Sequence, residues 1–372
     1  MTVVVVAPNA FKGTATAADA AAAIAAGWRS VRAQDELVLL PLADGGDGTL
    51  DAVAAAVPGA TRQPVEVSGP LGGRRLTEWL LLPDGTGLVE LATAGGLAVA
   101  EREPMSPRDR AALASTLGFG EATAAALDAG CSRLLLAVGG SASTDGGAGL
   151  LQALGARLLD PGGRPIPPGN AGLERLERVD LTGLRPQPSG GVAVLTDVRN
   201  PLLGPDGAAA VFGPQKGMDP VDLSGFAERL TAFARAVAAV APVDPATPGA
   251  GAAGGTAFAA LAWGAALVDG AAEVARISRL PAAVDRAATV VTGEGRYDRQ
   301  TAAGKAPALV LSLARLRGVP VRLVAGSVTA PVDDWADAVT LADLAGDAAR
   351  AMREPLTFLR VAGERLAARF SG

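Results

Sequence analysis

Short runs of aliphatic residues alternate with alanine-rich stretches at both ends of the chain. The runs are typical of buried strands and the alanine-rich stretches of helices. Such alternation predicts a parallel sheet covered by helices. The predicted strands of this type are residues 3–6, 37–40, 289–291, 321–324 and 339–341.

The middle of the chain has a different pattern. From about Arg62, short predicted strands are separated by the turn sequences GPLGG and PDG, which favour antiparallel hairpins. We therefore predict an α/β protein with a Rossmann-like parallel-sheet domain made from both termini, residues 1–65 plus 285–372. A mixed α+β domain, residues 66–284, is inserted into it. We expect the active site in the cleft between the two domains.

The chain contains no histidine and a single cysteine, Cys131. Catalysis by a Ser-His or Cys-His pair and metal sites with histidine ligands are therefore excluded. A lone cysteine forms no internal disulfide, and the scarcity of cysteine favours a cytoplasmic protein. The chemistry must use carboxylates, lysine, arginine, hydroxyl groups, backbone amides or a bound ion.

Charge, aromatic content and hydrophobic patterning argue against nucleic-acid and membrane partners. Lys+Arg 33 against Asp+Glu 38 gives a net charge of −5, and aromatic residues make up 3% without a basic stripe, so nucleic-acid binding is not expected. The uncharged stretch 245–268 is rich in Ala and Gly and contains Pro248, which favours a buried loop and helix over a membrane span. We expect small-molecule partners, and a homodimer is compatible with the sequence.

Five loops share one design, in which a Gly- and Asp-rich turn follows a predicted strand. Ligands of open α/β sheets bind at the carboxyl ends of strands, where helix N-termini also attract anions. The five loops therefore predict one polar site for an anion. They are PNAFKG (8–13), ADGGDG (43–48), GGSASTDGG (139–147), TDVRNP (196–201) and TGEGRYDRQT (292–301).

The loop at 139–147 is the best candidate for phosphate binding. Its small residues let backbone amides approach an anion, and Ser141, Ser143 and Thr144 add hydroxyl donors. The alternative is a Gly-rich turn in which Asp145 caps the next helix. The Walker A pattern GxxxxGK[ST] does not occur in the chain, which excludes the P-loop NTPase class.

One GxGxxG pattern occurs at residues 249–254. It follows Pro248 instead of a predicted strand, so the context of a dinucleotide-binding fold is missing. We expect a Gly-rich helix entry that either contacts phosphates or packs tightly.

The lysines are few: Lys12, Lys216 and Lys305, each next to a glycine. The other thirty cations of the 33 are arginines. A compact ammonium fits where the guanidinium fork does not, so these positions are predicted to contact phosphates or a carboxylate. Chance placement is the alternative for any single one.

Carboxylates in the same loops are candidate metal ligands and general bases. Magnesium needs one or two carboxylates besides phosphate oxygens and water, and phosphoryl transfer commonly uses a carboxylate base. The alternatives are helix capping, an Asx-turn and a solvated loop with a local pair to Arg296. The candidates are Asp44, Asp47, Asp197, Glu294 and Asp298.

Long motifs in this order and spacing resemble the bacterial type I glycerate kinases, which are glycerate 2-kinases. They include APNAFKGTATA, PLADGGDGT, GGSASTDGGAGLLQALGA, TDVRNPLLGPDGAAAVFGPQKG and TGEGRYDRQTAAGKAP, and the resemblance covers essentially the whole chain. It implies two α/β domains and transfer of the ATP γ-phosphoryl to D-glycerate with Mg²⁺, giving 2-phosphoglycerate and ADP. Two small departures are Asp47, which keeps the acidic charge of its motif, and Tyr297 before Asp298.

The resemblance and the residue types together suggest roles. Asp197 is the first candidate for general base and Asp298 the second, and Asp197 and Glu294 are candidate Mg²⁺ ligands. Lys12 and Lys216 are expected to act in catalysis by contacting phosphate or carboxylate. The expected substrate-binding residues are Asp44, Asp47, Arg296 and Lys305. The expected phosphate-binding residues are Gly139, Gly140, Ser141, Thr144, Gly146 and Gly147.

Three alternative functions remain at this stage. A glycerate kinase that forms 3-phosphoglycerate uses the same residue types. A dehydrogenase needs a nicotinamide fingerprint after a strand, and here that fingerprint is misplaced. A non-catalytic sugar-acid-binding protein is the alternative from a different class.

Overall fold

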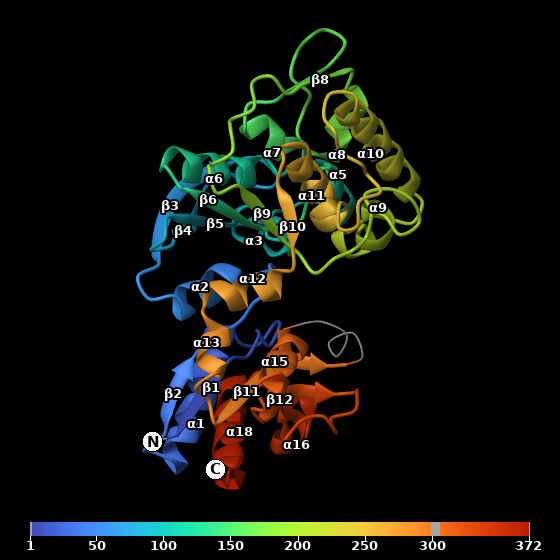
Figure 1. Ribbon diagram of the computed structural model, residues 1–372. Coiled ribbons are helices and arrows are strands. Elements are labelled where there is room, and N and C mark those ends of the chain that lie inside the picture. Colours follow the sequence, from blue (N-terminus) through green and yellow to red (C-terminus); the bar gives the residue numbers. More distant parts are fainter. Residues whose placement is uncertain (1, 299–305, 372) are drawn as a thin grey trace. The chain divides into compact units, whose positions relative to one another are not determined.

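The computed structural model describes residues 2–298 and 306–371, which divide into two compact units (Figure 1). The composition shift predicts changes of domain at 65 and 285, whereas the chain changes from one compact unit to the other after residues 44, 50, 58 and 270. Unit 1 consists of Met1–Asp44, Asp51–Pro58 and Ala271–Gly372. Unit 2 consists of Gly45–Leu50 and Gly59–Gly270.

Unit 1 contains a five-stranded sheet in which all neighbouring strands are parallel. Its order is β13-β12-β11-β1-β2, so the direction of winding reverses between β1 and β11. This is a doubly wound order, and it confirms the predicted parallel sheet. The strands are β1 (Val3–Val6), β2 (Glu36–Leu39), β11 (Thr289–Tyr297), β12 (Val321–Val328) and β13 (Asp337–Thr340).

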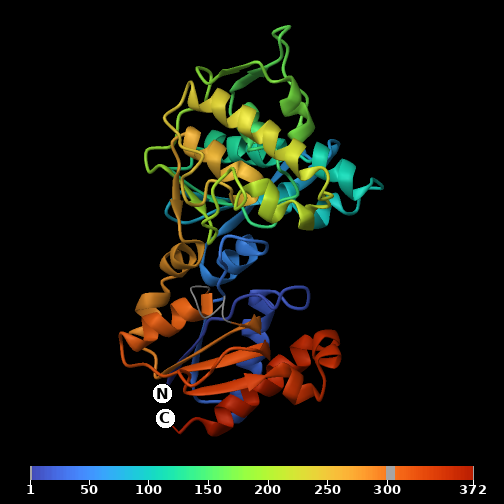
Figure 2. The same cartoon turned by 90° about the vertical axis from the view of Figure 1, so that its right-hand side faces the viewer.

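Helices cover both faces of this sheet. Val4 and Val6 belong to a core cluster with residues of α1 and α18, two helices that pack together, whereas α15 contacts β11 and β12. In Figure 2 the strands of unit 1 lie between α15 and the red C-terminal helices. The helices are α1 (Ala17–Val31), α2 (Thr49–Ala56), α12 (Gly270–Ile277), α13 (Leu280–Val284), α15 (Ala306–Arg315), α16 (Leu341–Ala345), α17 (Ala348–Arg353) and α18 (Pro355–Arg369).

Unit 2 contains a mixed six-stranded sheet of order β10-β9-β6-β5-β4-β3. The first four strands in this order pair in parallel, and β3 and β4 pair antiparallel, as do β4 and β5, which confirms the predicted hairpins. The strands are β3 (Thr61–Ser68), β4 (Arg74–Leu81), β5 (Thr86–Glu90), β6 (Arg133–Ala137), β9 (Val192–Leu195) and β10 (Ala266–Val268), and β7 (Arg157–Leu159) and β8 (Arg178–Asp180) form a separate hairpin.

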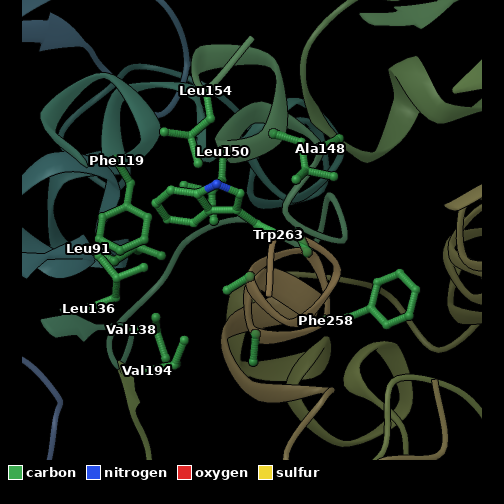
Figure 3. Packing of buried hydrophobic residues seen from close by; sticks show 14 of the residues in the cluster. Leu91, Phe119, Leu136, Val138, Ala148, Leu150, Leu154, Val194, Phe258 and Trp263 are labelled. Atoms are coloured by element: carbon green, nitrogen blue, oxygen red, sulfur yellow. The ribbon is translucent and has the colours of Figure 1, made fainter. Parts of the chain in front are cut away.

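The core of unit 2 lies between this sheet and its helices. Phe119, Leu150, Phe258 and Trp263 are buried in one cluster, shown in Figure 3. The helices are α3 (Leu91–Gly95), α4 (Leu97–Ala100), α5 (Pro107–Leu113), α6 (Leu117–Asp128), α7 (Ala148–Ala153), α8 (Gly169–Gly172), α9 (Ala208–Phe212), α10 (Leu223–Ala238) and α11 (Ala252–Ala262), with 3₁₀ turns η1 (Leu173–Arg175) and η2 (Pro214–Lys216).

The uncharged stretch 245–268 becomes a loop, helix α11 and strand β10. Phe258 is fully buried in the core of unit 2, as expected for a stretch that packs inside a protein. Across residues 2–298 and 306–371, no helix has both the length and the apolar character that a membrane crossing requires.

Candidate active site

A pocket of about 350 Å³ lies in unit 1 at the carboxyl ends of the parallel strands. Its volume falls in the range of small-molecule sites. Five of the predicted site residues line it: Lys12, Asp44, Glu294, Arg296 and Asp298. Asn9, Thr14 and Ser327 are further polar residues of the lining. Sequence reasoning did not single out Asn9, although it lies in the PNAFKG loop.

The topology of the sheet explains why these residues converge. β1 and β11 are neighbours where the winding direction reverses, so the chain leaves them toward opposite faces and a crevice remains. The backbone N–H of Asn9 donates to the carbonyl of Gly293 at 2.8 Å, which carries the pairing beyond the end of β1. The hydroxyl of Thr292 donates to the carbonyl of Ala7 at 2.7 Å. The loop after β1 is thereby held against β11.

Both signs of charge are present in this pocket. Arg296 Nε lies 3.5 Å from Asp298 Oδ2, and the Arg296 side chain remains 68% exposed. Lys12 is also exposed, whereas Glu294 is only 6% exposed. Cations of this kind bind carboxylates, and carboxylates accept hydrogen bonds from hydroxyl groups. The pocket therefore suits a small ligand that carries both groups.

The segment 292–301 was predicted as a loop, and the structure corrects this prediction for residues 292–297, while residues 299–301 lie outside the described part of the chain. β11 continues to Tyr297, because Arg296 pairs with Ser327 and Tyr297 with Val328 of β12. A Cβ on Gly326 would lie 2.3 Å from the carbonyl oxygen of Gly295, so these glycines serve close strand packing. Glu294 and Arg296 consequently stand on a rigid strand.

In unit 2, Lys216 lies inside the Gly-rich loop. It is 5% exposed, and its Nζ donates to Ser141 Oγ at 2.8 Å and to the carbonyl of Ser143 at 2.5 Å. Burial lowers the pKa of Lys216 to about 7, an effect that the nearby negative charge of Asp145 partly offsets. Lys216 thus holds the loop from within.

Asp145 is fully buried and acts as a cap, the alternative that the sequence left open. Its carboxylate accepts hydrogen bonds from the backbone N–H and the hydroxyl of Thr116, both at 2.9 Å. It also accepts from the backbone N–H groups of Gly147 at 3.0 Å and Gly149 at 3.3 Å, where α7 begins. Asp145 therefore ties the loop to the starts of α6 and α7.

The two Gly-rich segments of unit 2 pack against each other. Gly146 donates its N–H to the carbonyl of Gly254 at 3.0 Å, and a Cβ on Gly254 would lie 2.1 Å from the carbonyl oxygen of Ser143. A Cβ on Gly147 would lie 2.4 Å from the side chain of Ala259. Gly146 and Gly147 are therefore needed for packing, as is the second half of the GxGxxG pattern. Thr144 is likewise fully buried.

The start of the loop borders two other predicted loops. Gly139 donates its N–H to the carbonyl of Gly45 at 2.9 Å, and a Cβ on Gly45 would lie 2.5 Å from the carbonyl oxygen of Leu195. A Cβ on Gly140 would lie 3.6 Å from Cβ of Asp47. This edge of unit 2 is polar and accessible: Gly140, Asp47 and Asp197 are exposed.

Glu90 was missed by the sequence analysis. It is 1% exposed and accepts hydrogen bonds from the backbone N–H groups of Gly48 at 3.3 Å and Leu50 at 2.8 Å. It therefore caps the start of α2, the helix-capping role that was the alternative for Asp44 and Asp47. The available signal was one acidic residue in an otherwise apolar predicted strand.

The predicted metal ligands lie in different units, Asp197 in unit 2 and Glu294 in unit 1. Within the two described ranges, no three His, Cys, Asp or Glu side chains are grouped so as to hold a metal ion. Lys305 lies outside the described residues.

Comparison with known proteins gives consistent matches along the chain. The model of the glycerate kinase family matches residues 4–371. A glycerate kinase of Halalkalibacterium halodurans is 40% identical over 332 residues, which cover 88% of this chain and 86% of that protein. The glycerate 2-kinase of Escherichia coli is 38% identical over 330 residues, with coverages of 88% and 85%.

A solved structure extends the match to the fold. The crystal structure of a candidate glycerate kinase 2 from Salmonella typhimurium aligns with a TM-score of 0.85 at 37% identity, covering 99% of this chain and 97% of that one. The chain is an enzyme that belongs to the glycerate kinase family.

Proposed function

We propose that the protein transfers the γ-phosphoryl group of ATP to the 2-hydroxyl of D-glycerate, giving 2-phosphoglycerate and ADP. The observation that carries this proposal is the unit 1 pocket, where cations and carboxylates meet in a chain of this family. In the reaction the hydroxyl oxygen bonds to the γ-phosphorus while the bond to the ADP oxygen breaks. The hydroxyl proton passes to a carboxylate base.

Unit 1 would bind glycerate. Arg296 and Lys12 would hold the substrate carboxylate, and Asp44 would accept a hydrogen bond from a substrate hydroxyl. The exposure of Arg296 supports this assignment, because a planar guanidinium that solvent reaches can make a bidentate contact with a carboxylate. Lys305 would add a second ammonium.

Unit 2 would bind the phosphates of ATP. The backbone N–H of Gly140 and the hydroxyl of Ser141 would donate to phosphate oxygens, and Gly139 would allow close approach. Lys216 would stabilise this edge from inside the loop. Thr144, Gly146 and Gly147 would support it through packing, because they are buried.

Asp197 is our choice for general base. It is exposed just after the carboxyl end of β9, and a general base must be accessible to the substrate hydroxyl. Asp197→Asn should therefore lower kcat about 10²–10⁴-fold with little change in the KM for glycerate. A larger loss in Asp298→Asn than in Asp197→Asn would reverse the assignment.

Magnesium fits the donor set of this chain. The ion is satisfied by one or two carboxylates because it also binds phosphate oxygens and water, and Asp197 is accessible enough to contribute one. With Asp197 as the base, Glu294 would hold the ion, whereas Asp197 would hold it if Asp298 is the base. Asp47 would contact its water shell. When bound, Mg²⁺ neutralises charge on the phosphates.

An assay of ADP release with D-glycerate, ATP and Mg²⁺ tests the proposal. Arg296→Lys keeps the charge but loses the fork, so the KM for glycerate should rise about tenfold or more while the KM for ATP changes little. Arg360→Lys is the matched control, because Arg360 lies on α18 outside the pocket lining and should behave as wild type. Absence of glycerate-dependent ADP in the wild type would contradict the proposal and favour a binding protein.

A further inference from the structure

Lys216 is a buried cation that faces the inner side of the phosphate-binding edge proposed above. Its Nζ donates to Ser141 Oγ at 2.8 Å and to the Ser143 carbonyl at 2.5 Å, and the residue is only 5% exposed. Two of the three donors of its ammonium group are thus engaged inside the loop. Lys216 can act on a bound anion through these partners, and Ser141 is the partner with a proton of its own.

The chemistry of the two groups sets the direction of that proton. An ammonium group has three donors and no acceptor, so Ser141 Oγ must accept from Lys216 when the lysine is charged. The hydroxyl proton of Ser141 is then available to a different acceptor. A neutral amine has a lone pair and can accept the same proton. Protonation of Lys216 therefore leaves the Ser141 hydroxyl proton for an anion, whereas the neutral amine competes for that proton.

We propose that Lys216 is a positioning residue that turns the hydroxyl of Ser141 into a donor for a phosphate oxygen of the nucleotide, so that the phosphate is bound together with a proton on Lys216. This inference rests on the proposed placement of the ATP phosphates at Ser141. It assigns to Lys216 an indirect role in place of the direct phosphate contact expected from the sequence.

The charges around Lys216 support a protonation change near neutral pH. Asp145 is the charge that acts on it, and burial lowers the pKa of Lys216 to about 7. Of the two helices that pack against η2, α9 has no charged residue. On α5, Arg108 pairs with Asp222, and Arg110 donates to the Met105 carbonyl. The Asp109 carboxylate accepts a hydrogen bond from the Ser106 hydroxyl at 2.6 Å. An added phosphate would raise the pKa of Lys216 and favour proton uptake.

The test is the KM for ATP between pH 6 and 9 in the wild type, Lys216→Met and Ser141→Ala. The protonation of ATP itself is the same in the assays of all three proteins. The ratio of the variant's KM to the wild-type KM therefore reports only the contribution of Lys216 and its contact with Ser141. This ratio should be largest at pH 6 and fall above pH 7 by up to about tenfold per pH unit, because wild-type Lys216 then loses its charge. The KM ratio should fall in the same way for both variants, because each of them removes one member of the Lys216–Ser141 hydrogen bond.

The double variant and a charge control sharpen the result. Ser141→Ala/Lys216→Met should be no weaker than either single variant, because one residue acts through the other. Arg108→Met removes an exposed cation on α5 and should give a ratio near one at every pH. If Lys216→Met does not fold, the pH dependence of Ser141→Ala alone decides.

Ratios that stay constant with pH, or losses that add in the double variant, would overturn the inference. A wild-type protein without glycerate-dependent ADP release would instead overturn the proposed function. The two failures are distinguishable, because the first requires an active wild-type enzyme.

Discussion

Asp145 and Lys216 show how much of the Gly-rich loop is fixed by buried charge. Asp145 accepts four hydrogen bonds from Thr116, Gly147 and Gly149 at 2.9–3.3 Å, and Lys216 donates to two groups on the loop. Burying charged groups is costly unless their partners are in place. The loop therefore has one well-defined conformation, which is what preorganised anion binding requires.

We predict that Lys216 makes the stability of the protein depend on pH. Its pKa in the folded protein is about 7, below the ordinary value of 10.5. The unfolded chain therefore binds more protons between these values, and the unfolding free energy rises with pH in that window. The unfolding free energy of the wild type minus that of Lys216→Met, measured by urea unfolding, should increase by about 2 kcal/mol from pH 7 to 9. A difference independent of pH would show that the folded lysine has an ordinary pKa.

At the scale of elements, strands and helices with strong periodicity were predictable, and close packing was not. The predicted strand at 3–6 is confirmed. The helix that follows it begins at a local cap, in which Thr16 Oγ1 accepts the N–H of Asp19 at 3.0 Å. The segment 292–301 was predicted as a loop because its glycines and charges resemble a turn. Pairing of β11 with β12 as far as Tyr297 outweighs that local preference.

The Gly-rich segment at the start of α11 provides a test of packing. Ala253, Gly254 and Gly255 have positive φ inside this helix, and a Cβ on Gly254 would lie 2.1 Å from the Ser143 carbonyl oxygen. Gly254→Ala should lower the unfolding free energy by about 3 kcal/mol or more, because backbone must move. The measurement is chemical unfolding.

Gly225→Ala is the matched control on α10. The nearest atom to its Cβ would be a terminal nitrogen of Arg229 at 3.4 Å, and no clash arises. This substitution should be neutral or stabilise by up to about 1 kcal/mol. Equal effects of the two substitutions would show that the contact between the Gly-rich segments is dispensable.

At the scale of the whole molecule, each unit has its own hydrophobic core. Trp28 belongs to the core of unit 1, and Trp79 and Trp263 belong to that of unit 2. The alternating strands and helices at both ends of the chain and the hairpin signals in its middle indicated two different parts of the chain. It did not predict Glu90 as a buried cap or Lys216 as a buried donor, because both depend on contacts between residues far apart in sequence.

Separate cores predict separate responses to a core mutation. Leu150→Ala should destabilise unit 2 by about 2–5 kcal/mol. Trp28→Phe/Trp335→Phe leaves fluorescence from unit 2, and Trp79→Phe/Trp263→Phe leaves it from unit 1. When Leu150→Ala is added, the midpoint of urea unfolding should fall in the variant that reports on unit 2 and stay unchanged in the variant that reports on unit 1. An equal fall of the midpoint in both variants would show that the two units unfold as one.

Phosphorus NMR of the reaction mixture tests the central claim most directly. With D-glycerate, ATP and Mg²⁺, the γ-phosphate signal of ATP should decrease as a phosphomonoester signal of equal intensity grows. Coupling to the single methine proton of 2-phosphoglycerate predicts a doublet. A triplet, from the methylene group of 3-phosphoglycerate, would contradict the proposed position of transfer, and no phosphomonoester at all would contradict phosphorylation of glycerate by this chain.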